Sequence, residues 1–182
     1  MDTLQQYKTE VAACREIYHN KAMDYGTSWR IFRTISIVDQ IYIKAWRIRQ
    51  IQENGIQRID DSIENEFRGI VNYGLIALIQ LEIPKDSELD LTVEKAELLY
   101  DAQAKIVEDL MLKKNHDYGE AWREMSQASF VDIILTKLLR IKQILTNEGK
   151  TIASEGIDAN FCDMINYALF ALIKIKICIR TK

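Results

Sequence analysis

The sequence has few of the residues that build tight turns and no large excess of charge of either sign. Its 182 residues include seven glycines and one proline, which is low for a β-rich protein. A net charge of -3 provides no broad basic field, so we expect neither direct nucleic-acid binding nor a membrane partner. The apolar fraction of 48% is enough for a buried core, which excludes a disordered chain.

Cysteine is also scarce, and long apolar runs are absent. The three cysteines are Cys14, Cys162 and Cys178. Their odd number and their spacing match no metal motif, so we expect reduced core residues. The first ten residues are polar and lack an apolar targeting core, which predicts a cytoplasmic location. The most apolar stretch, 161–179, contains charged residues and is therefore expected to be a buried helix.

An internal repeat is the clearest feature of the chain. The phrase DYGTSW at Asp24 returns as DYGEAW at Asp117. With a shift of 93 residues, 24–51 and 117–144 share 14 identities in 28 positions, where chance gives roughly two. At a shift of 94, FRGIVNYGLIALI from Phe67 aligns with FCDMINYALFALI from Phe161. The chain therefore contains one unit twice.

Each unit is predicted to form three helices. The expected ranges are 4–23, 36–52 and 61–82, then 92–115, 129–145 and 156–179. Gly26 and Gly119 are placed to end the first helix of each unit, and Ser36 and Ser129 to begin the second. The third helices are apolar nearly all round, so each needs partners on several sides.

These features predict an all-α fold of two tandem three-helix repeats, packed as a pseudo-twofold helical bundle with one shared core. The first repeat spans 1–83, a linker with the sole proline spans 84–91, and the second repeat spans 92–182. Because the duplication itself supplies two units, a monomer is expected, with a homodimer as the alternative.

The second helices carry repeated cations beside an apolar stripe. These are Lys44 and Arg47, with the copies Lys137 and Arg140. Cations at such a border can line a pocket for phosphates or carboxylates. The alternative is that they extend toward solvent and pair with acids of neighbouring helices.

Other repeated polar and aromatic residues are candidates for ligand contact. They are Asp24, Tyr25, Trp29, Arg30 and Asn72, with the copies Asp117, Tyr118, Trp122, Arg123 and Asn166. Aromatic rings and guanidinium groups can stack on a base. The alternatives are a helix-ending turn for the acids, core packing for the tryptophans, and a structural hydrogen bond for the buried amides.

Five segments of the chain resemble a known family. The phrases KAMDYGTSWR, DQIYIKAWRIRQI, EFRGIVNYGLIALIQLE, LMLKKNHDYGEAWREM and SEGIDANFCDMINYALFALIKI are similar to the bacterial and phage nucleotide modification associated domain family. The resemblance covers nearly the whole chain, including the duplication. It implies work on nucleotides or modified bases.

The family is more distantly similar to all-α nucleotide pyrophosphohydrolases of the MazG and dimeric dUTPase type, which hold Mg²⁺ on carboxylates of two helices. This chain lacks their ExxE pair on the first helix of either unit. The resemblance leaves Glu66 and Asp163, together with Asp158, as candidate Mg²⁺ ligands.

Three functions follow as hypotheses. The first is a Mg²⁺-dependent nucleotide phosphohydrolase or pyrophosphohydrolase. The second is a non-catalytic module that binds a nucleotide or a related phosphorylated small molecule. The third is a structural module in which every repeated charge is a helix cap or a surface pair.

Overall fold

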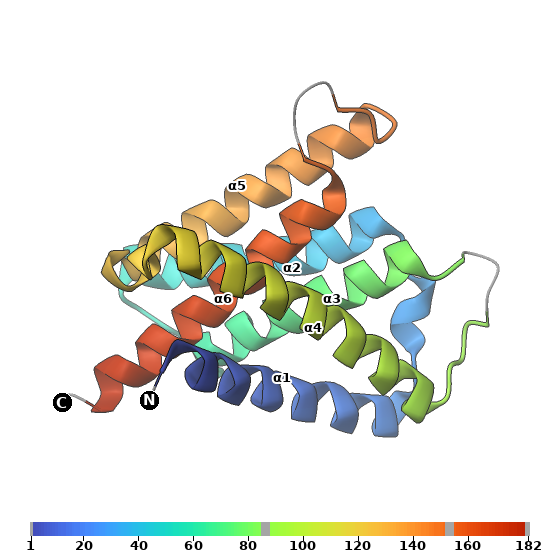
Figure 1. Cartoon of the computed structure of the whole chain (residues 1–182), viewed down its shortest axis with the longest axis horizontal. Coiled ribbons are helices and arrows are strands. Elements are labelled where there is room, and N and C mark those ends of the chain that lie inside the picture. The colour runs from blue at the N-terminus through green and yellow to red at the C-terminus, as the bar shows by residue number, and fades with distance from the viewer. Residues whose placement is uncertain (1, 85–87, 152–154, 181–182) are drawn as a thin grey trace.

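The described part of the chain folds into six α-helices in two similar sets of three (Figure 1). The computed structural model describes residues 2–84, 88–151 and 155–180, and this part contains no β-strand. The helices are α1 (Thr3–Tyr25), α2 (Thr34–Asn54), α3 (Ile63–Glu82), α4 (Val93–Tyr118), α5 (Gln127–Thr146) and α6 (Ile157–Arg180). Short 3₁₀ helices, η1 (Ser28–Ile31) and η2 (Ala121–Glu124), follow α1 and α4. The predicted all-α tandem repeat is confirmed.

Equivalent helices of the two repeats pack against each other. α1 contacts α4, α2 contacts α5, and α3 contacts α6. The apolar helices α3 and α6 lie in the middle of the bundle, as Figure 1 shows. Gly74 permits their close approach, because a Cβ there would lie 2.6 Å from a side-chain carbon of Ile165. Buried residues of both repeats form one continuous core cluster, which includes Phe67 and Phe161.

One glycine ends the first helix of each repeat. Gly26 has φ of 65° and Gly119 has φ of 58°, a region that a side chain disfavours. Their N–H groups donate to the carbonyls of Ala22 and Asn115, which closes the last turn. The chain then turns sharply into η1 or η2, and this turn places a tryptophan beside the third helix of its own repeat.

The second helices begin earlier than predicted. α2 starts at Thr34 and α5 at Gln127, two residues before the expected serines. The prediction that Ser129 begins α5 is wrong, because Ser126 caps the helix by accepting a hydrogen bond from the Ser129 N–H. A serine anywhere in a first turn gives a similar sequence signal, so the predicted start of α5 lies two residues too late.

Asp39 and Asp132, which lie near the starts of α2 and α5, join the two repeats. Asp39 pairs with Lys142 at 2.7 Å, and Asp132 pairs with Arg49 at 3.5 Å. Because each pair links α2 to α5 with the roles exchanged, the two contacts follow the pseudo-twofold relation. Exposed pairs of this kind contribute at most about 1 kcal/mol each to stability.

The remaining sequence expectations have mixed outcomes. Cys14 and Cys162 are buried, but Cys178 is exposed near the end of α6, so the core prediction is wrong for Cys178. Within the described residues, no helix is both long enough and apolar enough to cross a membrane. The predicted linker 84–91 contains 85–87, which lie outside the described residues, and the domain boundaries stay a prediction.

Candidate functional site

Each repeat contains a pocket between its first helix, its 3₁₀ turn and its third helix. The first-unit pocket has a volume of about 650 Å³, and the second-unit pocket has about 240 Å³. The repeat alignment superimposes much of their linings. Tyr25 and Trp29 line the first-unit pocket, and the residues aligned with them, Tyr118 and Trp122, line the second-unit pocket. The pockets are therefore two versions of one site.

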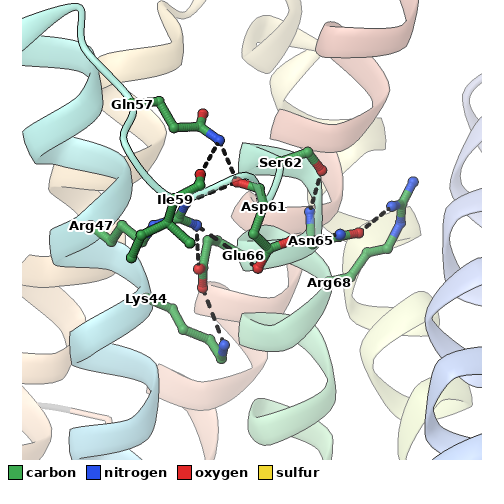
Figure 2. A network of polar contacts seen from close by, with 9 residues as sticks. All are labelled: Lys44, Arg47, Gln57, Ile59, Asp61, Ser62, Asn65, Glu66 and Arg68. Atoms are coloured by element: carbon green, nitrogen blue, oxygen red, sulfur yellow. Dashed lines mark hydrogen bonds and ion pairs between the residues drawn. The ribbon is translucent and has the colours of Figure 1, made fainter.

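In the first repeat, the predicted cations of α2 meet an acid of α3. Lys44 Nζ lies 3.1 Å from Glu66 Oε2, and Arg47 donates to Glu66 Oε1 at 2.6 Å. Arg47 also donates to the carbonyls of Ile59 and Asp61, at 3.2 and 2.8 Å. Figure 2 shows both side chains reaching across to Glu66. Lys44 also lines the first-unit pocket, whereas Arg47 does not.

In the second repeat, the acid stands one helical turn later. Asp163 accepts from Lys114 and from Lys137, each at 2.5 Å. Burial acts to raise the pKa of Asp163, but the hydrogen bonds from the two lysines outweigh it and hold that pKa below its ordinary value. Arg140 is exposed and makes no ion pair within the described part of the chain. The repeated cations therefore have different surroundings in the two repeats.

The repeated asparagines join the repeats by reciprocal hydrogen bonds. Asn72 donates to the Cys14 carbonyl at 3.0 Å and accepts from the Tyr100 hydroxyl at 2.8 Å. Asn166 accepts from Tyr7 at 2.8 Å in the same way. Both asparagines also line their pockets. Their amides satisfy buried polar groups, which is the structural role that the sequence left open.

The repeated arginines after the tryptophans hold the turns. Arg30 donates to the Glu88 carbonyl at 3.3 Å, and Gln80 donates back to the Arg30 carbonyl at 3.0 Å. Arg123 donates to Glu120 at 2.5 Å and lies 4.3 Å from the centre of the Trp122 ring. Neither arginine lines the first-unit or the second-unit pocket.

The repeated Asp-Tyr-Gly-x-x-Trp phrase divides between surface and pocket. Asp24 and Asp117 are exposed and line neither pocket. Tyr25 and Tyr118 line the pockets and remain 56% and 72% exposed, so a ligand can reach their rings. The tryptophans Trp29 and Trp122 are buried at the pocket walls.

Sequence reasoning missed several residues of the first-unit pocket, among them Lys21, Arg68 and Gly69. Lys21 is exposed and forms no ion pair or hydrogen bond with any described residue. Arg68 donates to Asn65 at 3.0 Å, while its Nε is buried without a partner among the described residues. Lys21 could have been found, because the shift of 93 places it on Lys114 just outside the aligned segment.

The tryptophan donors also differ between the pockets. Trp122 Nε1 donates to Asn115 Oδ1 at 3.0 Å, but the first repeat has Ala22 at that position. Trp29 Nε1 is buried and has no acceptor of good geometry among the described residues. Its N–H lies close to the Tyr18 hydroxyl: burial raises the pKa of Tyr18, and the N–H of Trp29 partly lowers it again. The two tryptophans therefore donate toward different groups in the two repeats.

The family model of nucleotide modification associated domain 1 matches residues 21–81 and 114–175, one segment in each repeat. Together the segments cover more than half of the chain. The chain belongs to this family. Each matched segment contains the pocket-lining lysine of the first helix and the asparagine of the third helix of one repeat. No curated protein and no solved structure matches the chain.

The carboxylates of this family member do not fit the Mg²⁺ site that the resemblance suggested. Glu66 and Asp163 belong to different repeats, and each is already bound by two cationic side chains. No group of three or more His, Cys, Asp or Glu side chains suited to a metal ion occurs in the described residues, Asp158 included. Mg²⁺ binding stays a prediction from the resemblance.

Proposed function

We propose that the first-unit pocket binds a nucleotide, with the phosphates at its cations and the base among its aromatic rings. The proposal is supported by the combination of cationic side chains, which phosphate recognition requires, with aromatic side chains, which base recognition requires. Its cations are Lys21, Lys44 and Arg68, and its aromatic rings are Tyr18, Tyr25, Trp29, Phe32 and Tyr73. Cations attract phosphate oxygens, and exposed rings such as that of Tyr25 offer stacking surfaces.

The volume of the pocket suits a ligand of this size. About 650 Å³ lies within the range of roughly 300–1,000 Å³ that is usual for small-molecule sites. The walls combine apolar side chains with a few polar groups, which is the usual composition of such sites. The second-unit pocket, at about 240 Å³, is too small by the same measure.

The observation that carries the proposal is the excess of cationic over acidic side chains in the first-unit pocket. Lys21 has no partner in the described residues, and Arg68 is bonded there to the neutral Asn65 and to no carboxylate. Of the charged residues that line the pocket, only Asp61 is acidic. Cations that no carboxylate neutralises attract anions, so an anionic ligand with several oxygens would pair with the charges that the protein leaves open.

Isothermal titration calorimetry with nucleoside mono-, di- and triphosphates tests the proposal. Each nucleotide is titrated with and without Mg²⁺, and turnover is followed by phosphate release. Metal-independent binding without turnover is expected for a binding module, whereas turnover that requires Mg²⁺ would support the predicted phosphohydrolase. No binding across the whole panel would contradict the proposal.

The matched variants are Lys21→Ala and Lys113→Ala. Lys21 is exposed and unpaired, so its removal should leave the fold intact and weaken binding about tenfold or more, because a charge-assisted hydrogen bond is worth about 1.5–3 kcal/mol. Lys113 is exposed on α4 and lines neither pocket. Its alanine variant should bind as the wild type does. Equal losses in both variants would show a general charge effect and reject the assigned pocket.

A further inference from the structure

We propose that the anionic group of the ligand binds over Gly69, between Lys21 and Lys44, where the second repeat has its own carboxylate, Asp163. The second-unit pocket is then a closed copy of the site, and each chain binds one ligand. This inference rests on the proposed function for the identity of the ligand as a nucleotide. The position of its anionic group is argued separately from the comparison of the two repeats.

The repeat alignment sets up the comparison. Lys21 corresponds to Lys114, Lys44 to Lys137, and Gly69 to Asp163. In the second repeat these three positions form one cluster, with the carboxylate of Asp163 bridging the two lysines at 2.5 Å on each side. The cluster lies at the wall of the second-unit pocket, which both Lys114 and Asp163 line.

In the first repeat, the lysines are kept and the carboxylate is absent. A Cβ added at Gly69 would lie 2.7 Å from Lys44 Cε and 3.1 Å from Lys44 Nζ, so the ammonium lies directly over the glycine. Lys21 lines the same pocket and has no partner among the described residues. Where the second repeat has an aspartate side chain, the first repeat therefore has the flexible end of Lys44, which must shift to let an anion from solution lie between the two lysines.

A third cation distinguishes the first repeat from its copy. Arg68 lines the first-unit pocket, and the repeat alignment places Cys162 at the same position. Arg68 is bonded to the neutral Asn65, and its Nε has no hydrogen-bond partner among the described residues. Three cations facing one opening favour a phosphoryl group, which has up to two negative charges and three oxygens, over a single carboxylate.

Glu66 does not compete for this position. It lies one helical turn before Gly69 and does not line the pocket. Arg47 is its closer partner, at 2.6 Å against 3.1 Å for Lys44. Because Arg47 continues to neutralise Glu66, Lys44 can turn toward a ligand without leaving a buried carboxylate unpaired.

The test exchanges the two residues. Gly69→Asp supplies the first repeat with an internal carboxylate, and Asp163→Gly removes it from the second. The flexible end of Lys44 must shift to admit the new side chain, as Lys137 does in the second repeat. Gly69→Ala is the matched control, since it adds the Cβ without the charge. Circular dichroism verifies that each variant is folded.

Binding and stoichiometry are measured by calorimetry with two probes, inorganic pyrophosphate and adenosine diphosphate. The wild type is expected to bind one equivalent, and Gly69→Asp should bind at least tenfold more weakly than Gly69→Ala. Asp163→Gly should gain a second, weaker equivalent of pyrophosphate, because the second-unit pocket is too small for a whole nucleotide. If Asp163→Gly does not fold, the comparison of Gly69→Asp with Gly69→Ala decides alone.

The two probes separate this inference from the proposed function. Pyrophosphate binding that Gly69→Asp abolishes, without any nucleotide binding, would keep the anion position and reject the nucleotide. Nucleotide binding that Gly69→Asp leaves unchanged would keep the nucleotide as the ligand and reject the anion position over Gly69. Two equivalents bound by the wild type, or no binding of either probe, would overturn the inference.

Discussion

Replacing Asn72 by alanine tests whether the repeated asparagines hold the two repeats together. The Asn72 amide links α1, α3 and α4, because it donates to the Cys14 carbonyl and accepts from the Tyr100 hydroxyl. Tyr100 has no exposed surface, so water cannot replace the lost acceptor without a rearrangement of the core. The change therefore leaves a buried hydroxyl unpaired.

The size of the effect follows from the two bonds. An unpaired buried polar group costs about 1–3 kcal/mol. The Cys14 carbonyl lies within α1, where helix bonding already supplies a donor, so Tyr100 accounts for most of the loss. We expect Asn72→Ala to lower the free energy of unfolding by about 2–3 kcal/mol. For a chain of this length that corresponds to about 4–12 °C in the unfolding midpoint.

Urea denaturation followed by circular dichroism measures this loss, and a double-mutant cycle assigns it. Asn72→Ala combined with Tyr100→Phe should cost less than the sum of the single changes by about 1 kcal/mol or more, because the pair interacts directly. Tyr73→Phe is the control, since the Tyr73 hydroxyl has no hydrogen bond within the described residues. A loss below about 0.5 kcal/mol for Asn72→Ala, or no coupling, would refute the reasoning.

Two further substitutions test the buried acids. Asp163→Asn leaves Lys114 and Lys137 without a carboxylate, so urea denaturation at neutral pH should show a loss of about 1–2 kcal/mol, reduced from the fully buried case because Lys114 is 44% exposed. Because the pKa of Asp163 is held below 3.8, its contribution to the free energy of unfolding is present above that pH and is lost as the pH falls through the lowered value. The free energies of unfolding of the wild type and Asp163→Asn should therefore converge at low pH. A difference that stays constant with pH would contradict the ion pair. Glu10 is 1% exposed; one carboxylate oxygen pairs with Lys176, and the other has no partner among the described residues. Glu10→Gln should therefore change the free energy of unfolding by less than about 1 kcal/mol or raise it, and a loss above 2 kcal/mol in the same assay would show that the charge stabilises the fold.

The fold could be predicted because each helix has a local signal. Gly26 and Gly119 end helices by their backbone conformation alone, and the apolar character of α3 and α6 requires burial on several sides. The start of α5 was misplaced, because Ser126 and Ser129 both suit a first turn and only the backbone geometry decides between them. Repetition gave the order of the helices, whereas their exact ends depend on single hydrogen bonds.

The candidate site was predicted only in part, since contacts between helices depend on the reach of side chains. Helical spacing placed Lys44 beside the apolar stripe, but it could not show that Glu66, one turn before Gly69, would be its partner. Arg68 was missed because the second repeat has Cys162 in its place, so a search for repeated residues passes over it. Lys21 lies just outside the aligned segment, and only the packing of α1 against α3 brings it to the pocket.

The difference between the repeats is more informative about binding than their similarity. Both third helices provide one buried carboxylate for the lysine of the second helix, as buried charges require. In α3 the acid is Glu66 and the next turn has Gly69, whereas in α6 the neutral Asn160 precedes Asp163. One turn is about 5.4 Å along the axis, enough to move the carboxylate from beside the pocket to its wall. The same rule of charge pairing thus leaves one pocket with unpaired cations and closes the other, without any change of fold.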